Sequence, residues 1–207
     1  MTMRLRHLEI ALQGLEGFAS PRPALEQYPT PAPLAARLLF FAAGHGEIGG
    51  RAVLDLGSGT GVLACGAALL GAASVTGVET DRAAIAVAGT NAERLGVAVE
   101  WVGGDVADLP EPVRSRVYDT VVMNPPFGAQ VTHADRPFVD AALAHGRSVY
   151  GLFNAGTLPF LERYIAGRGE VLETVAARLA LPRSMAHHRK AVVEIPVECV
   201  RIRSLVP

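Results

Sequence analysis

Short apolar runs alternate with amphipathic stretches along most of this chain. The apolar runs are rich in β-branched residues and predict strands at 52–56, 74–78, 99–103, 120–123, 148–152, 171–177 and 192–202. The stretches between them repeat apolar residues at helical spacing and predict helices at 62–70, 81–95, 137–145 and 157–166. Strands that alternate with helices in this way are typical of βαβ units and a parallel sheet.

The two ends of the chain complete this pattern. Two more helices are predicted at 5–15 and 34–43, with a proline-rich segment between them. The strands predicted at 171–177 and 192–202 follow each other without a helical crossover, so we expect the last one to run antiparallel. The expected fold is Rossmann-like α/β, with a seven-stranded, mostly parallel sheet, a reversed last strand and helices on both faces. Ligands bind such sheets at the carboxyl ends of the strands.

The composition points to a single structural domain. The chain has 207 residues, of which 50% are hydrophobic, enough to bury one substantial core. We expect residues 1–45 to pack on the ligand site as a helical, proline-rich segment and residues 46–207 to form the main domain. No apolar stretch reaches the ~18 residues of a membrane span, and the first residues lack a signal-peptide core, so we expect a cytoplasmic protein.

Charge and cysteine content exclude other classes. The net charge is −1, so any contact with nucleic acid must come from a local patch. The two cysteines, Cys65 and Cys199, fall in a predicted helix and a predicted strand. They encode neither a disulfide framework nor a zinc site, and we expect no metal ion in the chain.

The most informative motif follows the fourth predicted strand and reads Asn124-Pro125-Pro126-Phe127. A planar amine, such as the exocyclic nitrogen of adenine, is a poor nucleophile until its delocalised lone pair is localised. The Asn124 side-chain oxygen and the Pro125 carbonyl can each accept one N–H, and Phe127 can stack on the base. The motif therefore favours methyl transfer to nitrogen. It is also compatible with a rigid turn that ends a strand, and Phe127 with an ordinary core position.

A glycine-rich turn follows the first predicted strand, in the run VLDLGSGTG at 53–61. Glycines let the backbone approach a ligand closely, and the free N–H groups at the start of the next helix can hold a carboxylate or phosphate. A dinucleotide fingerprint spaces its glycines as G-x-G-x-x-G, whereas this turn has the G-x-G-x-G spacing typical of S-adenosylmethionine-binding turns. The sequence therefore favours S-adenosylmethionine as the cofactor over a dinucleotide.

Two acids follow the second and third predicted strands. Glu79 stands about twenty residues after the glycine turn, where a carboxylate can accept both ribose hydroxyls of the cofactor. Asp105 can accept from the cofactor's adenine amine. Either acid alone is compatible with a solvated strand end. However, the four features follow four successive predicted strands, in the order of the glycine turn, Glu79, Asp105 and the Asn-Pro-Pro-Phe motif. This joint order predicts one shared site.

These residues resemble those of class I S-adenosylmethionine-dependent methyltransferases, whose sheet carries a reversed last strand. A closer resemblance is to the archaeal and eukaryotic adenine-N6 methyltransferases that modify small-subunit ribosomal RNA. It covers nearly the whole chain and includes residues 15–18 (LEGF), 25–30 (LEQYPT), 133–138 (HADRPF) and 188–190 (HRK). Where that family often has Asp, this chain has Glu79, one methylene longer, and the ribose contact should survive.

The resemblance, with the glycine turn, defines the expected site. The catalytic residues are Asn124, Pro125, Pro126 and Phe127, and the cofactor-binding residues are Gln27, Thr30, Asp55, Gly57, Gly59, Thr60, Gly61, Val62, Glu79, Asp105 and Val106. A sulfonium methyl is already activated, so the enzyme mainly has to align the reacting atoms and exclude water. The amine proton can leave through Asn124 or the Pro125 carbonyl without a strong base.

Contact with RNA is expected from two basic segments. The densest basic cluster lies between the last two predicted strands, and the loop after the catalytic motif can close over a base turned out of its stack. The predicted RNA-contacting residues are His133, Arg136, His188, Arg189 and Lys190. The cluster is also compatible with a solvated hairpin tip. Around His187 the resembled family is more aromatic and richer in lysine.

Other functions remain open from the sequence alone. Other Asn-Pro-Pro enzymes methylate the glutamine of release factors, guanine in rRNA or adenine in DNA. From a different class, the chain could be a non-catalytic, cofactor-binding subunit for RNA binding or assembly. The resemblance also implies a partner, a small zinc-binding activator subunit that forms a heterodimer by adding a strand beside the sheet, with the strand at 99–103 as the expected contact.

Overall fold

The computed structural model of the chain describes residues 3–22, 26–127, 133–182 and 192–206. Each strand forms where apolar side chains alternate or concentrate in the sequence. Together the strands of the described residues form one sheet. They are β1 (Ala52–Leu56), β2 (Ser74–Glu79), β3 (Glu100–Gly103), β4 (Tyr118–Met123), β5 (Gly146–Asn154), β6 (Gly169–Pro182) and β7 (Val192–Ser204). All seven predicted strands are present, and β6 extends five residues beyond its predicted end at residue 177.

The helices lie before and between the strands. They are α1 (Leu5–Gln13), α2 (Ala32–Gly44), α3 (Val62–Leu69), α4 (Arg82–Leu95), α5 (Glu111–Arg114), α6 (Arg136–His145) and α7 (Leu158–Ile165). The sequence did not predict α5, which is a single turn that starts after Pro110. The other six match predicted helices, with ends shifted by one or two residues. None of the helices in the described ranges is both long and apolar enough to cross a membrane.

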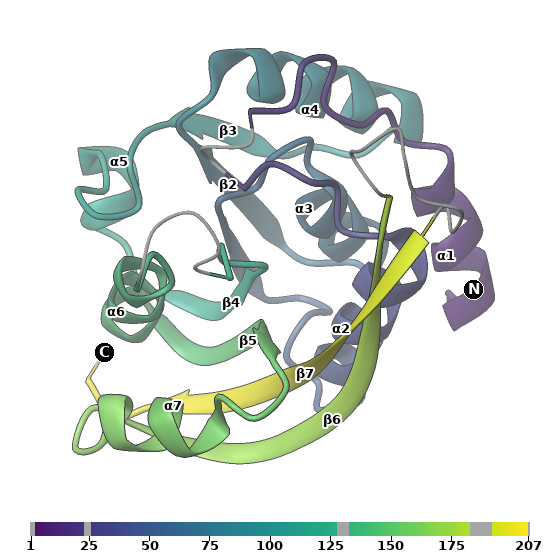
Figure 1. The fold of residues 1–207 in the computed structure, drawn as a ribbon. Helices are drawn as coiled ribbons and strands as arrows, with labels where there is room; N and C mark the ends of the chain where they lie inside the picture. Colours follow the sequence, from purple (N-terminus) through teal and green to yellow (C-terminus); the bar gives the residue numbers. More distant parts are fainter. Residues whose placement is uncertain (1–2, 23–25, 128–132, 183–191, 207) are drawn as a thin grey trace.

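The sheet has the strand order β3-β2-β1-β4-β5-β7-β6, with β3 and β6 at its edges (Figure 1). The pairs from β3 to β5 are parallel, and β7 is antiparallel to both of its neighbours. The order changes direction between β1 and β4, so the loops after these two strands diverge and leave room for a ligand. The expected mostly parallel sheet with a reversed last strand is confirmed.

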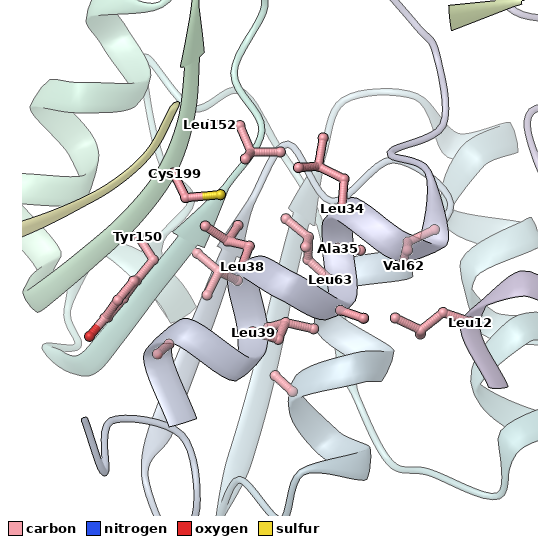
Figure 2. Close-up of a cluster of buried hydrophobic side chains, with 14 of the residues drawn as sticks. Leu12, Leu34, Ala35, Leu38, Leu39, Val62, Leu63, Tyr150, Leu152 and Cys199 are labelled. Carbon is pink, nitrogen blue, oxygen red and sulfur yellow. The ribbon is translucent and has the colours of Figure 1, made fainter. Parts of the chain in front are cut away.

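Two apolar cores cover the two faces of the sheet. On one face α1, α2 and α3 pack together, and Figure 2 shows Leu38 of α2 beside Tyr150 and Cys199 of the sheet. On the other face α6 packs against β4 and β5 and α7 packs against β6, through a core that includes Leu143 and Leu161. Because both faces are covered, the carboxyl ends of the central strands remain the open edge of the sheet.

Candidate active site

A cavity of about 450 Å³ lies at the carboxyl ends of β1, β2 and β4. Most of the predicted cofactor-binding residues line it. They are Gln27, Thr30, Asp55, Gly57, Gly59, Thr60, Val62, Glu79, Asp105 and Val106. Of the predicted catalytic residues, Asn124 and Pro126 line it as well. Residues from five separate parts of the chain, four of them predicted from strand-end positions and the part with Gln27 and Thr30 predicted from the resemblance, thus surround one space.

One side of the cavity, the glycine-turn wall, consists of residues 57–62 with Glu79 and Asp105. The Gly59 N–H donates to Glu79 Oε2 at 2.9 Å, and the Asp81 N–H donates to Glu79 Oε1 at 2.9 Å. The Glu79 carboxylate therefore holds the turn after β1 against the loop after β2. Asp105 accepts from the Ala107 N–H at 2.9 Å through Oδ1 and is otherwise exposed beside the cavity.

The glycines of this wall allow two aromatic rings to approach the turn. Gly57 and Gly59 have φ values of +67° and +53°, a region that L side chains rarely adopt. A Cβ on Gly57 would lie 2.7 Å from Phe138, and a Cβ on Gly59 would lie 2.9 Å from Phe18. Both phenyl rings line the cavity. The glycine turn is thus shaped as much by the rings that it admits as by a ligand.

Asp55 lies beneath the turn and is 1% exposed. Its Oδ2 accepts from the Ala64 N–H at 2.9 Å, and its Oδ1 has no hydrogen-bond partner among the described residues. Burial raises the pKa of this carboxyl to about 7, partly opposed by the Ala64 hydrogen bond and reinforced by the nearby charge of Glu79. A neutral Asp55 can both accept and donate a hydrogen bond.

The opposite side of the cavity, the strap wall, consists of residues 26–30, which we call the strap, and residues 124–127. Thr30 Oγ1 accepts from Asn124 Nδ2 at 2.9 Å. Glu26 Oε2 accepts from the Phe127 N–H at 2.7 Å. The Tyr28 and Phe127 rings stack with centroids 5.9 Å apart and planes at 18°. Three consecutive contacts therefore attach the strap to the Asn-Pro-Pro-Phe motif.

The Thr30 contact orients the Asn124 amide. Since Nδ2 donates to Thr30, the amide oxygen occupies the other position of the group. Asn124 Oδ1 is buried and has no hydrogen-bond partner within the described chain. A buried acceptor without a partner costs about 1–3 kcal/mol, so one at a cavity calls for a ligand that donates.

The strap is also connected to the glycine-turn wall. Gln27 Nε2 donates to Asp81 Oδ2 at 2.9 Å, and Gln27 Oε1 accepts from the Arg22 N–H at 2.8 Å. Asp81 is the N-cap of α4, where its Oδ1 accepts from the Ala83 N–H. The two walls thus meet through one carboxylate, two residues after Glu79.

Other predicted residues lie outside the cavity lining. Gly61 belongs to the glycine-turn wall but does not line the cavity, and a Cβ there would be 2.7 Å from Trp101. Pro125 is buried, and the half-buried Phe127 ring packs on Tyr28. Their predicted roles in binding cofactor and base stay predictions.

The predicted RNA-contacting residues fall in two groups. His133 is exposed and stacks on Phe160 with centroids 6.5 Å apart. The Arg136 guanidinium lies over Phe160 and Tyr164, at 5.3 and 5.4 Å from their ring centroids. Both follow the catalytic motif and lie beside Ala134, which lines the cavity. His188, Arg189 and Lys190 lie outside the described residues.

Four residues that line or support the cavity were not predicted from the sequence. Phe18, Tyr28 and Phe138 line the cavity. Phe18 and Tyr28 stand in aperiodic segments, where an isolated aromatic residue carries no positional signal, and Phe138 stands at the start of a predicted helix, where an apolar residue indicates only core packing. Asn91 is fully buried on α4, where its amide accepts from the Glu16 N–H at 2.8 Å and donates to the Glu16 and Thr60 carbonyls at 3.0 and 2.9 Å. Asn91 did carry one signal in the sequence, because it is a polar residue among the apolar residues that α4 buries.

The cavity lining fits S-adenosylmethionine better than a dinucleotide. Carboxyl groups line it at Glu26, Asp55, Glu79 and Asp105, whereas none of the described lining residues is Lys or Arg. An anionic pyrophosphate would be repelled there, while a sulfonium cation with a ribose finds acceptors. The glycine-turn wall would hold the adenosine part of the cofactor. Asn124 Oδ1, a hydrogen-bond acceptor, lies on the opposite wall.

Comparison with known proteins agrees with this geometry. Residues 36–173 match the family model described as the methyltransferase small domain. The chain is 37% identical to a protein of Methanocaldococcus jannaschii over 98% of this chain and 95% of that protein. It is 33% identical to the rRNA N(6)-adenosine-methyltransferase METTL5 of Danio rerio, over 96% and 98% of the two chains. A solved structure from Pyrococcus horikoshii, described as a candidate RNA methyltransferase, superposes with a TM-score of 0.89 at 37% identity and covers 100% of both chains.

Proposed function

The chain belongs to the methyltransferase small domain family and groups there with the rRNA N(6)-adenosine-methyltransferases, and from this premise we propose that it methylates the N6 amine of an adenine in small-subunit ribosomal RNA. The observation that carries the proposal is the unpartnered, buried Asn124 Oδ1 at the cavity, fixed by the Thr30 hydrogen bond. An acceptor in this position suits the N–H of a planar amine.

When bound, S-adenosylmethionine supplies an electrophilic methyl group. The chain's own residues bind, orient and exclude water. Glu79 is available for the ribose hydroxyls through Oε2, which accepts only the Gly59 N–H and retains a lone pair, whereas Oε1 already accepts from the Asp81 N–H and from Thr80 Oγ1. Asp105 Oδ2 is available for the adenine amine, and Val106 and Phe138 provide apolar contact. Gln27 and Thr30 complete the expected cofactor set on the strap wall.

At the target base, Asn124 and Pro125 each accept one N–H of the amine. Holding both hydrogens orients the nitrogen lone pair away from the ring, and proximity then provides most of the acceleration. The amine becomes acidic once it is methylated, so its proton leaves through these acceptors. Phe127 supports the base from the same wall.

RNA outside the target base would contact the surface beside α6 and the segment between β6 and β7. His133 and Arg136 offer an exposed ring and a guanidinium next to the cavity. His188, Arg189 and Lys190 complete the proposed set, which would bind phosphates in a salt-dependent way.

A small zinc-binding activator subunit is proposed at β3, with a cytoplasmic location for the complex. Support comes from the sheet order, because β3 is a four-residue edge strand whose outer backbone groups face no neighbouring strand of the described sheet. A partner strand added there would extend the sheet. The segment 1–45 contributes Phe18 and the strap to the cavity, which supports its proposed role as a part that packs on the cofactor site.

The proposed function is tested by methyl transfer from labelled S-adenosylmethionine to small-subunit rRNA that lacks its native methylation, followed by nucleoside analysis. Wild type should yield N6-methyladenosine, and Asn124→Ala should lower kcat on the order of 10²–10³-fold with cofactor binding retained. Thr90→Ala, on the exposed side of α4, serves as the control and should match wild type. No RNA product from wild type with intact cofactor binding, with and without the zinc-binding partner, would overturn the proposal.

A further inference from the structure

Tyr28 is the aromatic side chain of the strap wall that borders the cavity. Its ring stacks on Phe127 at a centroid distance of 5.9 Å, with the planes only 18° apart. Tyr28 lines the cavity, whereas Phe127 does not. Of these two nearly parallel rings, Tyr28 is therefore the one that borders the space in which a ligand fits.

Two hydrogen bonds between the strap and the Asn-Pro-Pro-Phe motif flank this pair of rings. The Phe127 N–H donates to Glu26 Oε2 at 2.7 Å, two residues before Tyr28. The Asn124 side chain donates to Thr30, two residues after Tyr28. The Tyr28 ring is thus fixed relative to the amide oxygen of Asn124 by contacts on each side. Burial and the neighbouring Glu26 charge raise the pKa of the Tyr28 phenol, so the ring stays neutral at physiological pH.

We propose that Tyr28 stacks directly on the target base and that Phe127 is a positioning residue that supports Tyr28 from behind. This inference rests on the proposed function and changes one part of it, because the sequence places Phe127 itself against the base. A flat ring beside the Asn124 oxygen holds the plane of the base while the amide binds its amine. Every base has a π face, so Tyr28 supplies binding and alignment, and the choice of adenine is left to the hydrogen bonds.

The experiment compares Tyr28→Leu, Tyr28→Phe and Phe127→Leu as full-length proteins. Each variant is measured for kcat and KM on unmethylated small-subunit rRNA, for the Kd of S-adenosylmethionine by calorimetry and for Tm. Stacking of a base on an aromatic ring is lost in Tyr28→Leu and kept in Tyr28→Phe. We expect kcat/KM for RNA to fall on the order of 10- to 100-fold in Tyr28→Leu, while Tyr28→Phe stays within about threefold of wild type. Phe127→Leu keeps the Tyr28 face and should lose less than Tyr28→Leu.

A second measurement reports stacking itself. An RNA oligonucleotide that spans the methylated adenine carries 2-aminopurine in its place, and a fluorescent base is quenched when it stacks on a ring. Bound to wild type, Tyr28→Phe or Phe127→Leu, the probe should stay quenched, and bound to Tyr28→Leu it should brighten. This readout does not change merely because a variant is less stable, provided that the variant binds the oligonucleotide.

The outcomes separate this inference from the proposed function. If wild type methylates RNA but Tyr28→Leu keeps full activity and a quenched probe, the inference is overturned and the proposed function stands. The inference is also overturned if Phe127→Leu alone brightens the probe. If wild type yields no methylated RNA while it binds S-adenosylmethionine, the proposed function fails, and the role of Tyr28 fails with it.

Discussion

The two walls of the cavity are built in different ways. In the glycine-turn wall, the contact between Gly59 and Glu79 joins residues 20 positions apart. In the strap wall, the contacts of Thr30 with Asn124 and of Glu26 with Phe127 join residues 94 and 101 positions apart. The first wall forms from consecutive βα units, whereas the second requires the chain before the sheet to return across its carboxyl edge.

This difference separates the two functions of the cavity. Local turns hold the glycine-turn wall, so a substitution there should appear first as a loss of cofactor affinity. Single side-chain contacts hold the strap wall, and a segment attached by so few contacts can open without unfolding of the sheet. Damage to the strap should therefore appear mainly in the alignment of the target amine, with a smaller loss of cofactor affinity through Gln27 and Thr30.

Among the changes that compare the two walls, the largest effect on cofactor affinity is expected from Gly59→Ala in the glycine-turn wall. The new Cβ would meet the Phe18 ring at 2.9 Å while the backbone keeps a left-handed φ of +53°. The backbone strain costs roughly 1–2 kcal/mol, and the displaced ring narrows the cavity. We expect the Kd for S-adenosylmethionine to rise on the order of 100-fold, as measured by calorimetry.

Gly71→Ala is the matched control for this variant. Gly71 has a φ of +84°, but a Cβ there would meet nothing within 4 Å. It should lower Tm by a few degrees through strain alone and leave the cofactor Kd unchanged. An equal loss of cofactor affinity in both glycine variants would show that strain, rather than the contact with Phe18, governs this wall.

A smaller effect is expected from Thr30→Val in the strap wall. Valine keeps the shape of threonine but cannot accept from Asn124 Nδ2, so the amide loses the contact that fixes its orientation. We expect kcat to fall about 10- to 100-fold, a larger factor than any rise in the cofactor Kd. Steady-state kinetics on rRNA and calorimetry provide the two numbers.

Thr30→Ser tests whether the hydroxyl is responsible, because serine restores the acceptor and removes only a methyl group. It should recover most of kcat. If Thr30→Ser is as slow as Thr30→Val, or if the cofactor Kd changes more than kcat, then Thr30 acts as a cofactor ligand rather than through Asn124. Substitutions in the two walls would then not have the separate effects on cofactor affinity and kcat that the contacts indicate.

The sequence predicted the glycine-turn wall much better than the strap wall, for the same physical reason. Turns between adjacent strands and helices are written in short motifs, so Gly59, Glu79 and Asp105 were found at consecutive strand ends. Tyr28 and Phe18 act through contacts with residues far along the chain, and no local period marks them. The resemblance marked the segments that contain both residues but gave neither a role.

The fold shows the same limit in α5 and β6. The four residues of α5 begin after Pro110, and one turn is too short to show helical periodicity. The strand β6 was expected to end at residue 177 but continues to Pro182 because β7 pairs with it over that length. Pairing between strands supplies hydrogen bonds that the apolar pattern of one strand does not reveal.

The last expected effect concerns stability beneath the glycine-turn wall, rather than binding or catalysis. Burial raises the Asp55 pKa from 3.8 to about 7, so the folded protein favours the protonated form. The stabilisation from this proton is complete below pH 3.8 and is lost as pH rises through 7, with a slope of at most about 1.4 kcal/mol per pH unit. Asp55→Asn stays neutral, and its amide oxygen can still accept from the Ala64 N–H. Urea unfolding without cofactor should therefore show Asp55→Asn gaining free energy of unfolding relative to wild type between pH 5 and pH 8.

The control for Asp55→Asn is the same change from Asp to Asn at the surface of the protein. Asp108, whose side chain is 87% exposed, provides it, and Asp108→Asn should shift the free energy of unfolding by less than about 1 kcal/mol at either pH. Suppose that the difference in free energy of unfolding between wild type and Asp55→Asn is the same at pH 5 and pH 8. Asp55 would then stay ionised in the folded protein over this range, as it is in the unfolded chain. The glycine-turn wall would then carry a buried charge, and the uncharged side chain should be the more stable at both pH values, because the cost of burying that charge would no longer depend on pH.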